Sequence, residues 1–432
     1  MDDRPAYPCC CFLRAGFSGC FEKARLEASV CATLRQHPLL TARVARCEGQ
    51  WTWMPVDNPQ IVIKWSSPPP GDELPPATRI DLTEEIGIRF QVLVDGARST
   101  LILQFHHAAC DGAGIFQFLH DLLIEYATAR ALPTGEAMRP RPALKNLARR
   151  RTFGLTIAGQ LAMVPRQIVN LWKAWAFVRR LPSPLLLYHA VSNQHPIPNQ
   201  YPAAVCARLT SEETAALRPL ARQLGVTTND LILRDTFLAC HEWRRLQGSH
   251  REKEWLRISV PMNLRKAHDR HLPAANFVSM VFLDRNAAAF ADPTALLGGV
   301  HREMSHHKQR KMGDTFSLLA ALGRRLPGGL KKHLWADKCL ATSVLTNLGT
   351  VFLRSPLKNS SGHLVAGGMT LETIDTLPPL RPYMAAGFAV GIYAGRLWIT
   401  LHHDPRHLKQ AEAQKLMEIL LRQIRSSINS LK

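Results

Sequence analysis

The sequence contains no uninterrupted apolar run near the 18 residues that suggest a membrane-spanning helix, so we expect no transmembrane segment. Its amino terminus, MDDRPAYPCCCFLRAG, lacks the basic start and the apolar run of a secretory signal peptide. Two aspartates and two prolines stand there instead. These absences favour a cytoplasmic protein.

Paired cysteine spacings are also missing. None of the ten cysteines belongs to a CxxC pair, and most lie inside apolar stretches. This pattern indicates free thiols in a reducing compartment, most of them buried like small hydrophobic side chains. It excludes a small protein held together by disulfides.

Negative charge is scarce. The chain has 34 acidic residues against 54 lysines and arginines, which gives a formal net charge of +20. Such a field attracts nucleic acid, an anionic membrane, an acidic carrier protein and a phosphate-rich cofactor alike, so charge alone does not choose among them. Because no helix-turn-helix, zinc-finger or aromatic RNA-binding motif is visible, we do not expect a nucleic-acid partner.

Residues 137–211 contain no acidic residue at all, whereas arginine and lysine recur throughout them. Apolar residues alternate with these basic ones on both sides of Pro165. The pattern predicts basic amphipathic helices, which are suited to peripheral contact with an anionic membrane. Helices packed on the body of the protein, with their basic side chains in water, explain the pattern equally well.

What the sequence does have is apolar material for a large core, with 46% hydrophobic and only 20% charged residues. Strands and helices alternate in both halves. We expect strands at 9–17, 89–94, 100–105, 256–262, 277–284, 370–374, 387–393 and 397–402, and helices at 22–36, 115–129, 212–224, 229–247 and 409–428. This order predicts an α/β protein of two lobes, residues 1–190 and 191–432. Each lobe is expected to be a mixed sheet flanked by helices, with a cleft between the two.

A motif of the form HHxxxDG follows the strand predicted at 100–105. It consists of His106, His107, Asp111 and Gly112 around three small residues. The strand would deliver both histidines to the rim of a sheet, and Gly112 would let the backbone turn. Asp111 would lie near the amino terminus of the next helix, where a carboxylate is stabilised.

Further segments follow in a fixed order. They are His37-Pro38-Leu39-Leu40, Thr228-Asn229-Asp230-Leu231, Val260-Pro261-Met262-Asn263-Leu264-Arg265, Asn276-Phe277-Val278-Ser279 and Thr346-Asn347-Leu348-Gly349. Together with HHxxxDG, this order resembles the CoA-dependent acyltransferase superfamily of chloramphenicol acetyltransferase. That superfamily includes condensation domains, wax ester synthase/diacylglycerol acyltransferases, alcohol acetyltransferases and plant BAHD enzymes. Ala275 stands where the family usually has glycine, and the "PLW" and "DFGWG" motifs are absent, so no branch is assigned.

The resemblance implies that His107 is the general base, taking a proton from a hydroxyl or amine as it attacks a thioester carbonyl. It implies a ternary complex in a tunnel between the lobes and no acyl-enzyme, so Cys110 is interpreted as a packing residue. Asp111 is implied to be structural and to pair with an arginine, for which Arg265 is the candidate. His106 is expected to support the loop.

The same resemblance makes the segment around Thr346 and Asn347 a candidate oxyanion donor. Asn229 and Asp230 are further candidates for lining the tunnel. No bound cofactor is expected, since acyl-CoA or an acylated carrier phosphopantetheine would enter as a co-substrate.

Three histidine clusters have other interpretations. A metal site made of His106, His107 and Asp111 is disfavoured because adjacent residues at a strand end point to opposite faces, and we expect no metal ion. The pair at 306–307 is expected on a solvated helix face. The pair at 402–403 is expected at a strand-to-helix junction.

The leading hypothesis is therefore an acyltransferase that moves an acyl group from acyl-CoA to a hydroxyl or amine acceptor, which is a small molecule or a lipid. A condensation enzyme that uses an acidic carrier protein remains an alternative. So does a catalytically degenerate, basic lipid-binding or nucleic-acid-binding protein on the same scaffold.

Overall fold

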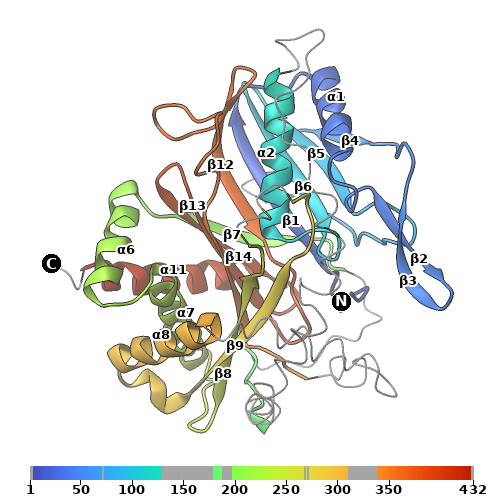
Figure 1. The fold of residues 1–432 in the computed structure, drawn as a ribbon. Helices are drawn as coiled ribbons and strands as arrows, with labels where there is room; N and C mark the ends of the chain where they lie inside the picture. Colours follow the sequence, from blue (N-terminus) through green and yellow to red (C-terminus); the bar gives the residue numbers. More distant parts are fainter. Residues whose placement is uncertain are drawn as a thin grey trace.

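The computed structural model describes residues 3–70, 73–128, 147, 179–186, 197–266, 269, 272–309 and 338–429. Within these ranges the chain forms two lobes, each built on a six-stranded mixed sheet flanked by helices (Figure 1). The predicted α/β class with two such lobes is confirmed.

The first sheet has the strand order β11-β12-β1-β6-β5-β4. Its strands are β1 (Cys10–Ser18), β4 (Ile63–Ser66), β5 (Ile88–Asp95), β6 (Arg98–His106), β11 (Val365–Ala366) and β12 (Met369–Leu377). β5 and β6 form the predicted hairpin, with Asp95 opposite Arg98. β6 is central, and its residues from Leu101 to His106 are all buried, which places the HHxxxDG motif at the end of a buried strand.

The second sheet has the order β7-β14-β13-β10-β8-β9. Its strands are β7 (Ala203–Arg208), β8 (Trp255–Asn263), β9 (Val278–Asn286), β10 (Ser343–Thr350), β13 (Ala386–Tyr393) and β14 (Arg396–His403). β10 runs parallel to both of its neighbours. Thr346 and Asn347, expected in a loop, therefore belong to a strand of this sheet.

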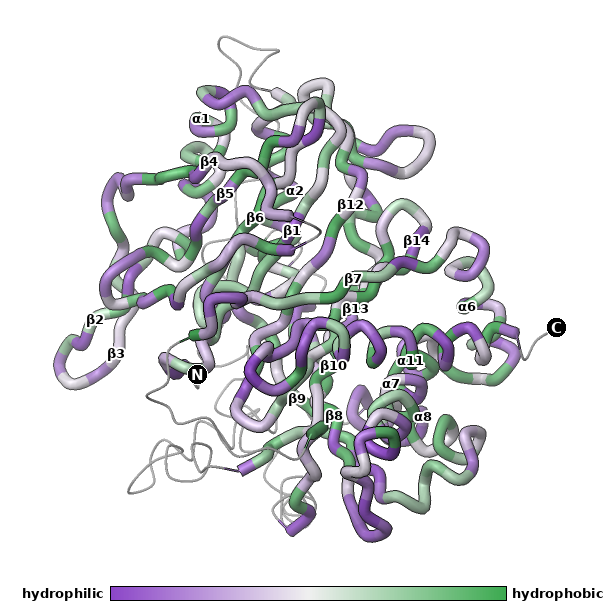
Figure 2. Tube along the Cα trace, turned by 180° about the vertical axis from the view of Figure 1, so that it is seen from behind, coloured by the Kyte–Doolittle hydropathy of each residue, from purple (hydrophilic) through white to green (hydrophobic). Residues whose placement is uncertain are grey.

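Helices cover both sheets. α1 (Lys23–Leu34) and α2 (Gly112–Thr128) pack on the first, and α6 (Ser211–Gln223), α7 (Thr228–Leu246), α8 (Pro293–Gln309) and α11 (Gln410–Asn429) on the second (Figure 1). The α11 trace alternates between hydrophilic and hydrophobic colours in Figure 2, because residues such as Leu416, Leu420 and Ile424 face the core. A hairpin of β2 (Ala42–Cys47) and β3 (Gln50–Pro55) projects from the first lobe. None of the described helices is long and apolar enough to cross a bilayer.

Two strands from the second half of the sequence, β11 and β12, complete the first sheet. β12 pairs antiparallel with β1, so that Leu377 lies opposite Phe12. Its Asp375 is only 1% exposed and accepts hydrogen bonds from Arg14 on β1 at 3.0 Å and from Arg208 on β7 at 2.9 Å. One buried carboxylate thus ties the two sheets together. The lobe boundary near residue 190 stays a prediction, and residues 365–377 lie in the first sheet.

The histidine pair at 306–307 differs in part from its prediction. The pair at 306–307 lies on α8, but the His307 side chain is buried, so the solvated face predicted for it is wrong there. The His307 ring lies 3.7 Å from Glu303 through Nε2, on a helix that packs against α7 and β9. The basic helices predicted within residues 137–211 fall mostly outside the described residues, as does the helical region expected beyond residue 309.

Candidate active site

The HHxxxDG motif forms a tight turn between β6 and α2. The backbone N–H of His106 still bonds to the first lobe, donating to Gly87 O at 2.9 Å, and that of His107 donates to Cys9 O at 2.8 Å. The Ala109 N–H then turns back to His106 O, also at 2.9 Å. The turn therefore holds both histidines at the end of the sheet, where the sequence predicted them.

The His107 ring has a defined proton arrangement. Its Nδ1 lies 2.9 Å from the carbonyl oxygen of Cys110. Because a carbonyl only accepts, Nδ1 carries the hydrogen, and the lone pair of the neutral ring lies on Nε2. Nε2 has no hydrogen-bond partner among the residues described and is not fully buried. Burial of the ring lowers the pKa of His107 below its ordinary value of 6.5, which favours this neutral form.

His106 has the opposite arrangement. Its Nδ1 accepts the Ala108 N–H at 3.1 Å, so its hydrogen lies on Nε2, which is 3.4 Å from a carboxylate oxygen of Asp3. Burial raises the pKa of Asp3, but hydrogen bonds from His106, Arg79 and the Cys9 backbone outweigh this and lower it to about 2. His106 is 3% exposed and has a partner at each nitrogen, which suits the supporting role expected of it.

Asp111 is fully buried and holds the turn to the second lobe. Its Oδ1 accepts the Gly114 N–H at 2.8 Å, which caps the start of α2. Its Oδ2 accepts the Phe277 N–H at 2.7 Å and Arg265 Nη1 at 2.8 Å. The ion pair expected between Asp111 and Arg265 is therefore present, and it connects β6 to the segments flanking β8 and β9.

Close packing strengthens the same junction. Asn276 Nδ2 donates to the backbone carbonyl of His107 at 2.7 Å. A Cβ atom at Gly114 would lie 3.0 Å from the backbone N and O of Ala275, and one at Gly112 would lie 2.7 Å from Leu348 Cδ2. The motif's backbone thus touches the second lobe directly. The His107 turn lies where the two lobes meet.

The candidate tunnel residues divide into two groups. Asn347 Nδ2 donates to Asn229 Oδ1 at 3.0 Å, so the structure brings these two together. Thr346 is half-buried on β10, and its hydroxyl has no hydrogen-bond partner among the described residues. Asp230 is buried in the capping box of α7, where Oδ2 accepts the Thr227 N–H at 3.0 Å and lies 2.8 Å from His301 Nδ1. Oδ2 of Asp230 therefore serves the helix cap, and a place for Asp230 in the tunnel stays a prediction.

The other histidine pair and the cysteine of the motif are buried packing residues. Over the described ranges, the residues of HHxxxDG do not converge as metal ligands. The pair at 402–403 ends β14 as predicted and is buried, which lowers the pKa of His402 to about 4. All ten cysteines are free, and Cys110 is buried with its thiol on the Asp111 carbonyl.

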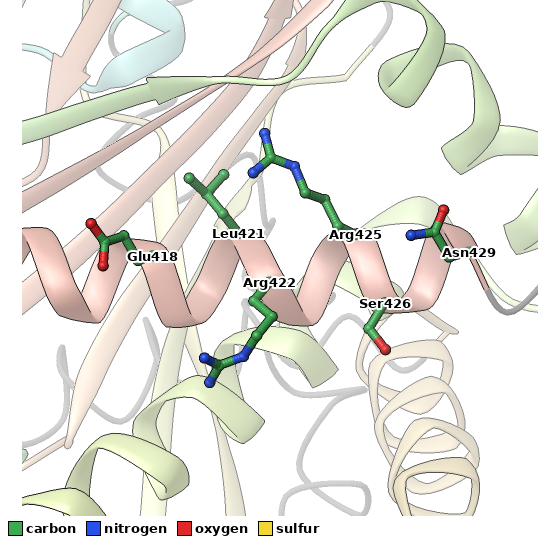
Figure 3. Close-up of a pocket in the computed structure, with 6 residues that line it drawn as sticks. All are labelled: Glu418, Leu421, Arg422, Arg425, Ser426 and Asn429. Carbon is green, nitrogen blue, oxygen red and sulfur yellow. The ribbon is translucent and has the colours of Figure 1, made fainter.

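Two surface hollows of the described residues are lined by residues outside the HHxxxDG motif. One is a face of α11 lined by Glu418, Leu421, Arg422, Arg425, Ser426 and Asn429 (Figure 3). All six side chains project from a single helix, so this is a shallow polar surface. The other lies around Tyr7, Tyr201 and Asp404. The tunnel expected at His107 stays a prediction.

Sequence reasoning did not assign a role to His37 or Asn276, although both lie in quoted segments. His37 is 1% exposed, accepts the Ala274 N–H at 2.8 Å through Nδ1 and has Nε2 3.2 Å from Asp121 on α2. It therefore joins α2 to the loop before β9. Both side chains support the site by hydrogen bonds to backbone atoms of distant residues. A sequence motif does not predict which backbone atom a side chain will contact.

Replacing Asp111 by asparagine would leave Arg265 without its counter-ion and would place an amide N–H against buried donors. We expect Asp111→Asn to lower the free energy of unfolding by about 3–5 kcal/mol. Urea denaturation of the full chain measures this. Asp57→Asn is the same change at an exposed position and should stay within about 0.5 kcal/mol of the parent. Equal effects of the two changes would contradict the structural role.

The chain is similar to known proteins both in sequence and in fold. No protein-family model matches the chain. An uncharacterised protein of Mycobacterium tuberculosis is 24% identical over 366 residues, which cover 78% of each chain.

Solved structures match over nearly the whole length. The first condensation domain of the calcium-dependent antibiotic synthetase aligns with a TM-score of 0.69 at 14% identity, over 99% of this chain and 92% of that one. Polyketide synthase associated protein 5 from Mycobacterium tuberculosis gives 0.64 at 14%, over 98% and 95%. The starter condensation domain of rhizomide synthetase, solved as a variant in complex with C8-CoA, gives 0.64 at 14%, over 99% and 90%. The chain therefore has the two-lobed fold of these condensation domains and of polyketide synthase associated protein 5.

Proposed function

We propose that this protein is an acyltransferase that moves an acyl group from acyl-CoA to a hydroxyl or amine acceptor, with His107 as general base. The observation that carries the proposal is the His107 ring. Its Nδ1–H is held by the Cys110 carbonyl at 2.9 Å, and its Nε2 lone pair is free of any partner among the described residues. A neutral imidazole fixed in this tautomer is ready to accept one proton.

The proposed reaction requires His107 to accept one proton from the acceptor and to return it to the leaving group. The acceptor O–H or N–H hydrogen-bonds to Nε2 and loses its proton as the heteroatom attacks the thioester carbonyl. The carbonyl π pair moves to oxygen, giving a tetrahedral oxyanion. When the oxyanion collapses, the C–S bond breaks and the imidazolium returns its proton to the leaving thiolate. His107 is thus regenerated, and no acyl-enzyme forms.

The oxyanion needs a donor. The side-chain amide of Asn347 donates a hydrogen bond to Asn229. The Thr346 hydroxyl, on the same strand, has no hydrogen-bond partner among the described residues. Leu348 on that strand lies against Gly112 of the motif, which brings β10 to the His107 turn. Thr346 is therefore our candidate oxyanion donor.

Two features favour a CoA thioester as the acyl donor. The formal charge of +20 would attract the phosphates of coenzyme A. A solved protein with the same fold is in complex with C8-CoA. The acceptor proposed is a small molecule or a lipid, and in the second case residues 137–211 would provide peripheral contact with an anionic membrane.

A second candidate function is carrier-dependent condensation. Condensation domains with the same fold favour it, and an acidic carrier protein would also be attracted by the basic surplus. Its donor would be an acylated phosphopantetheine on the carrier. The chemistry at His107 would be unchanged.

Removing the His107 imidazole should lower acyl transfer by about 10² to 10⁴-fold, because this is what a general base contributes. The measurement compares the His107→Gln variant with the parent. It records how much radiolabelled acyl group each protein transfers from acyl-CoA to acceptor molecules extracted from cells. His363→Gln changes a histidine on the far loop before β11 and should keep full activity. Full activity in His107→Gln would refute the mechanism. No transfer by the parent from either donor class would leave the degenerate lipid-binding scaffold as the better description.

The donor class is tested by offering the same acyl group on coenzyme A and on a phosphopantetheinylated carrier protein. We expect transfer from acyl-CoA without any carrier, with kcat/KM falling as ionic strength rises because surface charge attraction is screened. Transfer from the carrier alone would instead establish the condensation alternative.

The pH dependence follows from the lowered pKa of His107. The neutral ring is the active form, so a lower pKa keeps the enzyme active to lower pH. We expect kcat/KM to be constant above pH 6.5 and to fall, with a one-proton slope, at a midpoint below 6.5. An acidic limb with its midpoint above 6.5 would show that a different group, or a charged environment, governs the reaction.

A further inference from the structure

Two histidines and a glutamate converge on the flank of the second lobe, on elements that carry none of the HHxxxDG motif. They are His241 near the end of α7, His250 in the turn that follows and Glu254 directly before β8. One ligand atom from each residue lies within 4.8 Å of the other two. In the part of the chain that the structure describes, this is the one group of its kind.

The turn after α7 brings the three together. Gly248 has a φ of 62°, which ends the helix and reverses the chain. The Ser249 N–H donates to Arg244 O at 2.9 Å, and the Ala287 N–H donates to Glu254 O at 3.2 Å. Backbone hydrogen bonds thus fix both ends of the segment that carries His250 and Glu254.

His241 is oriented but unsatisfied. Its ring stacks on Phe290 with centroids 4.3 Å apart and meets the His250 ring edge-on at 5.0 Å. Its Nδ1 is buried and has no hydrogen-bond partner in the described part of the chain. A buried ring nitrogen without a partner costs free energy that a ligand would recover.

Both oxygens of the Glu254 carboxylate have a partner, Arg244 on one and His250 on the other. Oε2 accepts from Arg244 at 3.1 Å and 2.6 Å, which fixes the carboxylate. Oε1 faces His250 Nδ1 at 2.9 Å. The guanidinium also offsets the carboxylate charge, so the cluster favours an ion that bonds to neutral imidazole over Mg²⁺ or Ca²⁺, which prefer all-oxygen sites.

We propose that His241, His250 and Glu254 form a binding site for one Zn²⁺ ion, with water as the fourth ligand. Two histidines and a glutamate are an established zinc donor set, and Zn–N distances near 2.0–2.1 Å place neighbouring ligands about 3.4 Å apart. To reach this spacing, separations of up to 4.8 Å in the cluster need to shorten by up to about 1.4 Å, and the 2.9 Å between His250 Nδ1 and Glu254 Oε1 needs to widen by about 0.5 Å. The His250 side chain, 30% exposed and in a turn, is free to make that movement while its proton moves to Nε2. The ion would join the end of α7 to the start of β8. The site departs from our expectation of no metal and is independent of the proposed acyl transfer.

The test uses the full chain stripped with a chelator and dialysed free of it. Zinc binding is measured by competition with a chromophoric chelator, and the thermal midpoint is recorded with and without zinc. His250→Gln and His241→Gln remove one ligand each. His363→Gln is the matched control, because His363 also lies near a glutamate, with Nε2 3.8 Å from Glu372, but has no second histidine among the described residues.

We expect one zinc per chain in the parent and in His363→Gln, a higher thermal midpoint with zinc, and at least 10-fold weaker binding in both ligand variants. Cobalt(II) in place of zinc should give tetrahedral d–d bands without a thiolate charge-transfer band. Absence of stoichiometric binding, equal affinity in His250→Gln and the parent, or a thiolate band that assigns the metal to cysteines would each overturn the proposal. Acyl transfer is not a readout, so its loss or presence leaves this result unaffected.

Discussion

The buried carboxylate of Asp111 is the interaction on which the candidate site depends. Its two oxygens take three donors, from the start of α2, from the Phe277 backbone and from Arg265. Each donor belongs to a different segment, and two of the three lie in the second lobe. A carboxylate in this place therefore sets how the lobes meet, and the position of His107 follows because only three residues separate it from Asp111.

The same device recurs across the molecule. Asp375 is buried between Arg14 and Arg208 where β12 joins the two sheets, and Glu254 is buried on Arg244. Acidic residues are scarce in the sequence, and several of them are used inside the protein in this way. Each of these carboxylates is paired with at least one arginine, so the pairs do not account for the formal net charge of +20. That surplus of basic residues would attract an anionic substrate or surface.

The sequence predicted the α/β lobes, the β5–β6 hairpin and most long helices, because hydrophobic periodicity and turn residues act locally. It could not predict that β12 completes the first sheet or that His307 is buried, since both depend on contacts between distant segments. At the site, the motif predicted His107 and Asp111, and order along the chain predicted Arg265. The capping box that Thr227 and Asp230 form was also not recognised from the sequence, and a place for Asp230 in the tunnel stays a prediction.

Tautomer geometry explains why the second histidine of the motif, and not the first, is suited to be the base. At the end of β6 the two rings have different partners. His106 points to Asp3 and uses both nitrogens in its own support, so it has no free lone pair at neutral pH. His107 has its Nδ1–H on the Cys110 carbonyl, a partner supplied by the turn that the motif itself makes. The spacing from His107 to Asp111 thus serves two purposes, since it closes the turn that orients the ring and anchors that turn to the opposite lobe.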